Sequence, residues 1–490
     1  MPKLYVFGIG GTGSRVLRSL TMLLAAGVET NGYEIVPIII DPDVANADLT
    51  RNIEILRKYK AIHDELEFTE GSKLSFFRTK LNPGVDDYTI SLRETNDKTY
   101  EEFISLEEMD VANKAMAMML FSEANLKSDM RVGFKGNPNI GSVVLSQIFQ
   151  TKEFNDFASS FGEEDRIFII SSIFGGTGAS GFPLFLKQFR GENNKKFVNS
   201  ERLRKAEIGA ITVLPYFLLD QDEESAIDSS TFMSKTRAAL RYYDDNIKDE
   251  VDVLYYIGDN AKNKVYDNSD GGATQENDAN LIEVLAATAI IDFCQNSKDY
   301  EREDSSAVKA KYKEFGLIFG ENCSEDEVTL QNFGGICNNS FDYRKNFVSP
   351  LIEFALFAKS LVQDYKYVSS QNLKANSNLK SKEAFYNENF VRNVRGFLSE
   401  YISWLSELKE NLPSFVPFNF ESGNLADLKN LVRDLKKVKK SFFSFSRDVD
   451  EDSFRSELNG VSPKGNSDKE KFMEIYNVAA KKFASDKYKF

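Results

Sequence analysis

Two glycine-rich segments, each directly after an apolar run, hold the residues best suited to chemistry in this sequence. The first reads GIGGTGS at residues 8–14 and follows Lys3–Phe7; the second reads GGTGASG at residues 175–181 and follows Ile167–Ile173. Because glycine has no side chain, the backbone there can approach an anion closely, and the free N–H groups of a following helix start point at it. Each segment therefore predicts a phosphate cradle made of a buried strand, a turn and a helix start.

We expect the backbone amides of both segments to hold the α- and β-phosphates of a nucleotide, with hydroxyl groups as additional donors. The candidate residues are Gly10, Gly11, Thr12, Gly13 and Ser14 in the first segment and Gly175, Gly176, Thr177 and Gly178 in the second. Asp41 ends the next apolar run. It can hold a ribose hydroxyl or a water-bound Mg²⁺, and it can equally be a strand-end cap.

The elements that must position these residues are apolar runs that alternate with amphipathic segments. Buried strands are predicted at 3–7, 35–40, 167–173, 208–214 and 251–257, and helices at 15–26, 230–243 and 280–293. This alternation predicts an α/β fold with a doubly wound parallel sheet. In such a sheet of order 3-2-1-4-5-6, strands 1 and 4 are neighbours where the order reverses. If the second segment follows strand 4, both glycine-rich segments face one crevice and hold one polyphosphate.

The composition restricts the class of protein. The chain has 490 residues, a formal net charge of −14 and 42% hydrophobic residues, which is ordinary for a globular protein of two or three domains. The acidic balance argues against a general nucleic-acid binder, and no run of about 18 apolar residues predicts a membrane span. Three scattered cysteines and the lack of a signal-peptide pattern lead us to expect a cytoplasmic protein. With His63 as the single histidine, His-based triads and zinc sites are close to excluded.

The first segment alone fits more than one class of nucleotide site. Its GxGxxG at residues 8–13, with Asp41 at the end of the next strand, fits a dinucleotide-binding fingerprint. Together with DPD at 41–43 and RN at 51–52, it also resembles the ThiF-like adenylating enzymes. A Walker A P-loop is excluded, because the sequence has no GxxxxGK[ST]. The second glycine-rich segment favours another class, since a Rossmann enzyme needs only one such turn.

With both segments and a third loop, the chain resembles the tubulin/FtsZ family of GTPases over roughly residues 1 to 320. The family signature GGGTG[ST]G is similar to FGGTGASG at 174–181, and the family's glycine-rich first loop is similar to GIGGTGS at 8–14. The family loop for the terminal phosphate, GAGANPEVG in bacterial members, is similar to FKGNPNIGS at 134–142. The turn Gly258-Asp259-Asn260 resembles the family's IPND turn.

The resemblance implies GTP or GDP as the ligand, with Mg²⁺, and a head-to-tail homopolymer that hydrolyses GTP at the subunit interface. Gly136 and Asn137 would then sense the γ-phosphate, and Asn280, at the start of the central helix, would read the guanine edge. An acidic loop after that helix is implied to orient water at the nucleotide of the next subunit. Glu303 and Asp304 are the catalytic candidates there, although the family's NxDxxD spacing is missing.

Two other hypotheses remain open. One is an adenylating or NAD-binding enzyme built on the first segment alone. The other is a nucleotide-binding scaffold that neither hydrolyses nor polymerises.

The pattern also predicts how the chain is divided. We expect a GTP-binding domain at 1–277 with an insertion at about 50–130, a central helix at 278–295, an activation or intermediate domain at 296–360 and a mostly helical region at 361–490. The last region contains a locally basic segment with phenylalanines, residues 430–447. It can contact a protein adaptor or an anionic surface, and it can also be a solvated helix face.

Overall fold

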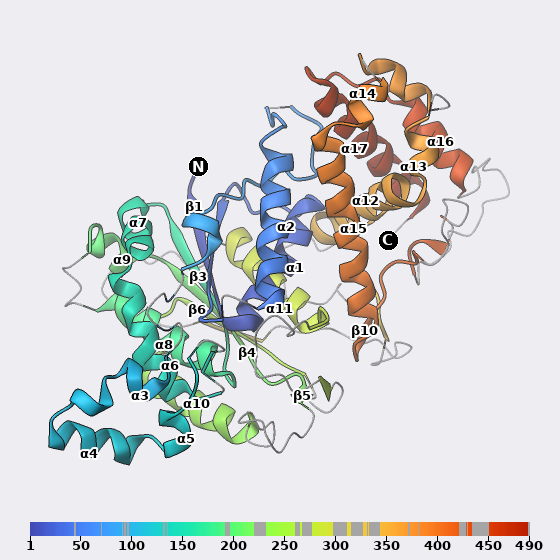
Figure 1. Ribbon diagram of the computed structural model, residues 1–490. Coiled ribbons are helices and arrows are strands. Elements are labelled where there is room, and N and C mark those ends of the chain that lie inside the picture. Colours follow the sequence, from blue (N-terminus) through green and yellow to red (C-terminus); the bar gives the residue numbers. More distant parts are fainter. Residues whose placement is uncertain are drawn as a thin grey trace.

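The computed structural model shows an α/β sheet domain beside a group of helices from the C-terminal part of the chain (Figure 1). It describes all residues except 44–45, 70, 91, 93–94, 96–97, 131–132, 135, 192–196, 220–231, 260–264, 267–276, 297–310, 315–326, 331, 333–343, 371–372, 381, 421–427, 429, 434–449 and 489–490.

Six parallel strands form the main sheet, in the order β2-β1-β3-β4-β6-β8. Their bounds are β1 (Lys3–Ile9), β2 (Glu34–Ile40), β3 (Arg166–Ser172), β4 (Ile208–Val213), β6 (Val253–Ile257) and β8 (Lys311–Glu314). The first five are mostly apolar and rich in β-branched residues, as expected for parallel strands that are covered on both faces. The predicted α/β class with a parallel sheet is confirmed, and the strand order reverses next to β1.

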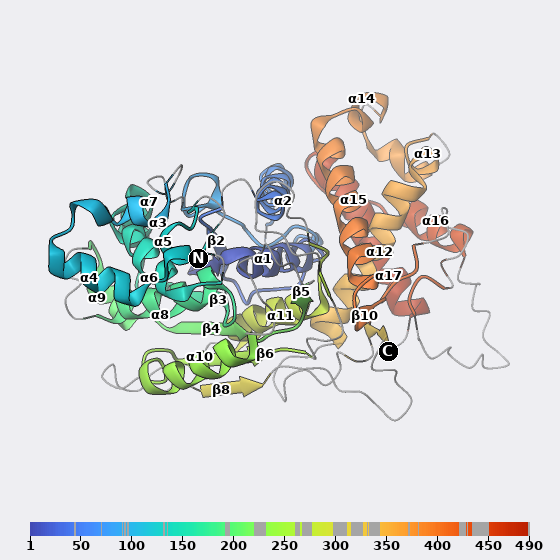
Figure 2. The same cartoon turned by 60° about the horizontal axis from the view of Figure 1, so that its bottom comes forward.

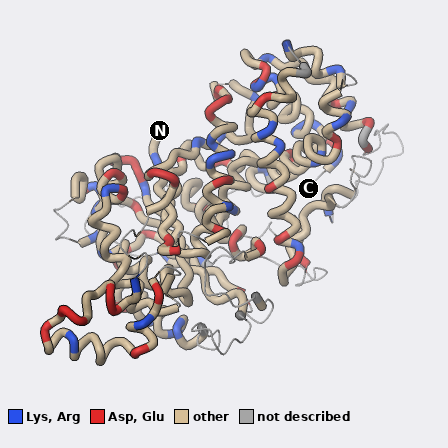
Figure 3. Tube along the Cα trace, viewed as in Figure 1, with Lys and Arg blue, Asp and Glu red and all other residues tan. Residues whose placement is uncertain are grey.

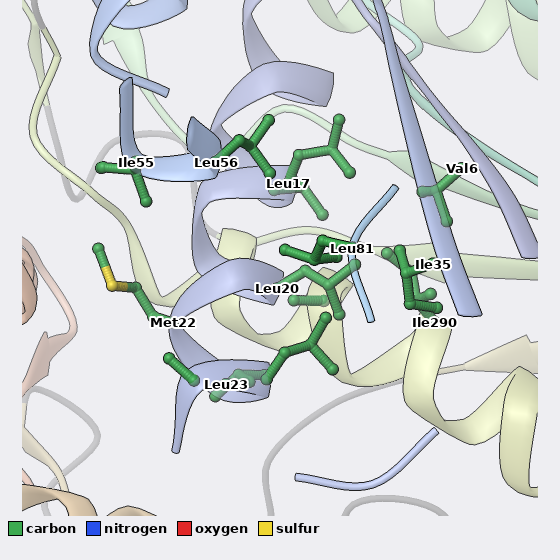
Figure 4. Packing of buried hydrophobic residues seen from close by; sticks show 14 of the residues in the cluster. Val6, Leu17, Leu20, Met22, Leu23, Ile35, Ile55, Leu56, Leu81 and Ile290 are labelled. Carbon is green, nitrogen blue, oxygen red and sulfur yellow. The ribbon is translucent and has the colours of Figure 1, made fainter. Parts of the chain in front are cut away.

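Alternate side chains of β1 point into two different helical layers. Phe7 packs against Phe157 of α7 (Lys152–Ser160) and Phe189 of α8 (Gly176–Arg190), with ring centroids 5.1 and 5.6 Å apart. On the opposite face, Val6 belongs to the cluster that α1 (Gly10–Ala25) and α11 (Leu281–Gln295) fill with leucine and isoleucine (Figure 4). Helices therefore cover both faces of the sheet, as Figures 1 and 2 show.

The outer edge of β2 is covered by residues 80–90. Two parallel bridges join Ile35 to Leu81 and Ile39 to Thr89, and the Ile90 N–H donates to Ile39 O at 3.0 Å. An open edge would offer unpaired N–H and C=O groups to other chains, and this segment prevents that. It lies where the order 3-2-1-4-5-6 places strand 3.

The segment that the sequence sets apart as an insertion, residues 50–130, belongs to the sheet domain over much of its length. Helix α2 (Ala47–His63) packs on α1 through Ile55 and Leu56 (Figure 4), and residues 80–90 follow β2. Only α3 (Tyr100–Phe103), α4 (Val111–Leu120) and α5 (Glu123–Leu126) form a protrusion, at the lower left of Figure 1. The charged pattern of this stretch is compatible with a helix, but only the contacts of α2 with α1 and α15 (Asn389–Lys409) assign it to the sheet domain.

Helix α4 presents an apolar surface to solvent. The side chains of Val111, Met116, Met118, Met119 and Leu120 are 59–87% exposed, and Ala117 is the buried residue of this helix. Acidic residues gather on the same protrusion (Figure 3). Large exposed apolar patches on soluble proteins commonly mark a surface that a partner covers.

The helices after residue 349 pack around aromatic rings. Phe354 and Phe357 of α12 (Ser349–Ala358) meet Tyr401 of α15 (Asn389–Lys409) and Tyr476 of α17 (Asp468–Lys487), with ring centroids 4.9 and 4.7 Å apart. Since β8 joins the main sheet and α12 joins these helices, the predicted intermediate domain at 296–360 is divided between two neighbouring parts of the described structure.

The remaining elements are short or peripheral. They are α6 (Pro138–Leu145), α9 (Ser200–Lys205), α10 (Phe232–Asn246), α13 (Tyr365–Val368), α14 (Lys382–Tyr386), α16 (Glu451–Gly460), and the strand pairs β5 (Leu218–Leu219) with β7 (Val265–Tyr266) and β9 (Glu327–Val328) with β10 (Ser414–Phe415). Among the described helices, none is both long and apolar enough to span a membrane.

A buried ion pair fastens α15 to α1. The Nη1 and Nη2 atoms of Arg18 donate to the two carboxylate oxygens of Glu407 at 2.6 and 2.8 Å, and Arg18 is 2% exposed. Arg51 of α2 and the Ala279 N–H also donate to this carboxylate, at 3.2 and 2.9 Å. Burial raises the pKa of Glu407, but the hydrogen bond from Arg18 and the charges of Arg18 and Arg51 outweigh it and lower that pKa. Glu407 thus joins α15 to three segments of the sheet domain.

We predict that Glu407→Ala lowers the thermal unfolding midpoint, because removing one partner of a buried ion pair costs about 3–5 kcal/mol. Since folding lowers the pKa of Glu407, its contribution is present above the ordinary glutamate pKa of about 4.3 and is lost as the pH falls through the lower folded-state pKa. In calorimetric scans, the difference in unfolding midpoint between wild type and variant should therefore become smaller toward acidic pH. The matched control is Glu410→Ala, at an exposed carboxylate of the same helix end; a loss equal to that of Glu407→Ala would contradict the prediction.

Candidate functional site

The two glycine-rich segments lie against each other because their strands pair. β1 and β3 are parallel neighbours, with Leu4 opposite Arg166 and Gly8 opposite Ile170. A Cβ atom placed on Gly10 would lie 3.3 Å from Thr177 Cβ and 3.6 Å from the backbone N of Gly178. Residues 8–14 and 175–181 are therefore close enough for one ligand to touch both, as the sequence predicted.

The third loop, residues 134–142, closes on the second. A Cβ atom placed on Gly176 would lie 3.1 Å from the backbone N atoms of both Gly136 and Asn137. At the other end of the loop, a Cβ on Gly141 would overlap the Ser180 side chain. The Asn137 N–H donates to Phe134 O at 2.8 Å, and its side-chain oxygen accepts from Asn139 N at 3.2 Å at the start of α6. Contact of Asn137 with a γ-phosphate stays a prediction.

The glycine runs are already the first turns of helices, whereas the sequence pattern places the helix starts after them. Helix α1 begins at Gly10 and α8 begins at Gly176. Such glycines avoid a clash: a Cβ on Gly13 would lie 2.5 Å from the backbone carbon of Gly8, and one on Gly178 would lie 2.7 Å from Ser172 O. Both helices can therefore start directly above their own strands, which brings their first amides together.

The N-termini of α1 and α8 lack the usual side-chain caps. Neither Ile9 nor Gly175 makes a capping hydrogen bond with its side chain, and neither helix has an acidic residue in its first turn. By contrast, Asn46 caps α2 and Asn280 caps α11 through their side-chain oxygens. The first N–H groups of a helix need an acceptor, and the positive end of its dipole favours an anion. The N–H groups of the two uncapped helix starts can therefore act together on one polyanion.

Asp41 follows β2 and is almost fully buried beside this place. Its Oδ1 accepts from Asp43 N at 3.1 Å, which is the strand-end cap that the sequence allows. Burial raises the pKa of Asp41 to about 7, although that hydrogen bond opposes the shift. Near neutral pH this carboxyl can therefore either donate a proton to a hydroxyl oxygen or attract a cation. Contact with ribose or with water-bound Mg²⁺ stays a prediction.

Arg15 anchors the start of α1, and the sequence reasoning missed it. Its Nε donates to Glu283 Oε1 at 2.6 Å and its Nη2 donates to Tyr216 Oη at 3.0 Å, while its Nη1 lies 3.5 Å from Asp48 Oδ2. Burial lowers the pKa of Arg15, but Tyr216, Glu283 and Asp48 raise it well above its usual value. The signal in the sequence was an arginine directly after a glycine-rich helix start. An arginine that is buried there needs an acidic partner.

Ser14 and Asn280 both have structural partners. Asn52 Nδ2 donates to Ser14 O and Ser14 Oγ at 2.9 and 3.2 Å, which ties α1 to α2. Asn280 is 2% exposed, and its Oδ1 accepts from Ile282 N at 2.9 Å, while the Asn280 N–H donates to Glu283 Oε2 at 3.1 Å. This capping box accounts for Asn280 as a helix start. Contact of Asn280 with a base stays a prediction.

The catalytic candidates Glu303 and Asp304 lie outside the described residues, as do Lys135 and Asn260. In the described part of the chain, no group of three His, Cys, Asp or Glu side chains is arranged to hold a metal ion.

No family model matches this chain, and no curated protein matches its sequence. Solved structures that align with part of it include CetZ from Methanosaeta thermophila strain DSM 6194 (18% identity over 53% of this chain and 46% of that one, TM-score 0.26) and CetZ2 from Haloferax volcanii in a GTPγS-bound protofilament (13% identity over 52% and 49%, TM-score 0.25). Each alignment spans about half the length of the solved chain. At such low TM-scores these similarities establish no common fold, and the fold class follows from the strand order of this chain.

Proposed function

We propose that this protein binds GTP where residues 8–14, 175–181 and 134–142 meet. These segments are called the first, second and third loops below. Helices α1 and α8 follow neighbouring parallel strands and start, without side-chain caps, at Gly10 and Gly176. The contact between these two helix starts is the observation that carries the proposal. Two sets of amides and two helix dipoles acting on one ligand favour a polyphosphate over a single carboxylate or phosphate. The choice of guanine rests on the resemblance of residues 8–14, 134–142 and 174–181 to the tubulin/FtsZ motifs.

The amides of Gly10 to Gly13 and of Gly175 to Gly178 would hold the α- and β-phosphates. Gly136 would face the γ-phosphate, because its backbone N lies next to the start of α8. Asp41 would hold the ribose or a water-bound Mg²⁺. When bound with the nucleotide, Mg²⁺ would neutralise phosphate charge.

The alternative of an adenylating or NAD-binding enzyme uses the first loop and the Arg51-Asn52 element. Here Arg51 pairs with Asp48 and Glu407, at 3.1 and 3.2 Å, and Asn52 bonds to Ser14. Both side chains thus hold helices together, which favours a site built on the three loops. Nucleotide preference separates the classes: GTP should protect the protein against thermal unfolding, and ATP and NAD should not.

Self-association and hydrolysis form the second half of the proposal. Head-to-tail stacking would bring an acidic loop of one copy, with Glu303 and Asp304, to the γ-phosphate of the next. Helix α4 supports self-association, because its apolar side chains are exposed to solvent on a protrusion. Burying these side chains against a second copy of the chain would be favourable. A scaffold that binds GTP without stacking or hydrolysis is the competing hypothesis.

We predict that Gly10→Ala weakens GTP binding by at least about tenfold, as measured by isothermal titration calorimetry. Gly10 has φ +73°, which a side chain disfavours, and the new Cβ would press on Thr177. Gly32→Ala is the matched control, because Gly32 has φ +83° but open space around it. Gly32→Ala should carry a similar backbone strain and keep the wild-type affinity. Normal affinity in Gly10→Ala would remove the first loop from the site.

We predict that Asp304→Ala abolishes most GTP turnover while GTP affinity is unchanged, because the residue would act on the nucleotide of the next subunit. Phosphate release measured against protein concentration checks this, and its onset should be cooperative. Glu301→Ala, in the same acidic run, is the control and should retain turnover. If Asp304→Ala hydrolyses GTP at the wild-type rate, that residue has no part in the reaction.

We predict that Met119→Asp reduces GTP-dependent pelleting and light scattering, because it places a charge in the apolar surface of α4. The control is Ser122→Asp, which adds the same charge to the same protrusion at an exposed polar residue, where aspartate can still cap α5. GTP affinity should be normal in both variants, since α4 lies outside the three loops. Equal pelleting of both variants would show that α4 is not part of the contact between copies.

A further inference from the structure

Lys235 reaches the third loop from a distant part of the chain. It lies in the first turn of α10 (Phe232–Asn246), and its Nζ donates to Gly136 O at 3.1 Å. Gly136 has φ +70°, and a Cβ placed on it would lie 3.2 Å from Lys235 Nζ. A side chain at position 136 would therefore disturb both the backbone and this contact, so the glycine and the lysine fit each other.

The Lys235 ammonium group and the start of α8 both lie close to Gly136. The backbone N of Gly136 is 3.1 Å from the Cβ position of Gly176, and the Gly136 carbonyl accepts from Lys235. The lysine also lines a cavity of about 530 Å³ together with Asn137, Lys127 and the acidic Asp129. The ammonium therefore lies next to the loop that the proposed function places at the terminal phosphate.

The described residues of the third loop, Phe134 and 136–142, contain no charged side chain. The backbone amides of this loop would contact only a terminal phosphate, and a cation beside them would add a charge-assisted interaction to that contact. A positive charge near the terminal phosphate acts on the additional negative charge of the triphosphate, and this attraction is stronger near a protein surface than in bulk water. A lysine that also holds the loop backbone keeps that charge at a constant place.

We propose that Lys235 is a positioning residue that holds the third loop against α8 and makes the site prefer a nucleoside triphosphate over a diphosphate. This inference rests on the proposed function, since it concerns the same nucleotide. It adds a charged group from α10, outside the three loops themselves, to the surroundings of the terminal phosphate.

The test measures the affinities of GTPγS and GDP for the full-length wild type and three variants by calorimetry. Lys235→Met should weaken GTPγS binding by about tenfold and leave GDP affinity unchanged. Lys235→Arg keeps the charge and a donor, so it should retain most of the preference for GTPγS. Lys127→Met is the matched control, because Lys127 lines the same cavity but pairs with Glu123, and it should change neither affinity.

The outcomes separate this inference from the proposed function. If the wild type binds neither nucleotide, the proposed function fails and the inference fails with it. If the wild type binds both and Lys235→Met keeps the wild-type ratio of affinities, only the inference is overturned. An equal loss of GTPγS and GDP affinity in Lys235→Met would likewise overturn it, because a purely structural role predicts that result. A lower thermal midpoint with an altered affinity ratio would still support it.

Discussion

Parallel pairing of β1 with β3 is the constraint on which the candidate site depends. The strand order reverses at β1, so the chain leaves β1 toward β2 and reaches β3 on the other side. The helices that follow these two strands therefore lie on opposite faces of the sheet, yet they begin next to each other at its carboxyl edge. Glycines at both starts let the backbones approach within a few ångströms. Any other neighbour for β1 would separate the two sets of amides.

Helix α1 connects this edge to the rest of the molecule. Arg15 binds Glu283 at the start of α11, Ser14 binds Asn52 of α2, and Arg18 binds Glu407 of α15. Each contact is buried or partly buried, so each charge or polar group has a partner that offsets its loss of hydration. The helix that carries the first loop is thus held by three other helices, one of them from the C-terminal group. This makes the position of the first loop dependent on how that group packs.

The sequence reasoning identified the strands and the glycine segments because both signals are local. Apolar runs of five to seven residues in the sequence recur as β1 to β4 and β6 within two residues at each end. It misplaced the starts of α1 and α8, since glycine usually indicates a turn, whereas here close packing on the strand makes glycine the residue that fits a helix start. It also assigned α2 to an insertion, because the contacts of this charged helix with α1 and α15 join segments that are remote in sequence.

By itself, the amino-acid sequence determined the α/β class, the two glycine-rich segments and their expected meeting, because these depend on residue type and short-range spacing. Only the tertiary structure decided which polar residues have other partners: Asn280 caps its helix, Ser14 bonds to Asn52, and Arg51 pairs with Asp48 and Glu407. It also brought Lys235 to Gly136, across about a hundred residues of chain. Such contacts join residues that are remote in sequence, and the packing of whole elements sets their distances, so no local pattern could contain them.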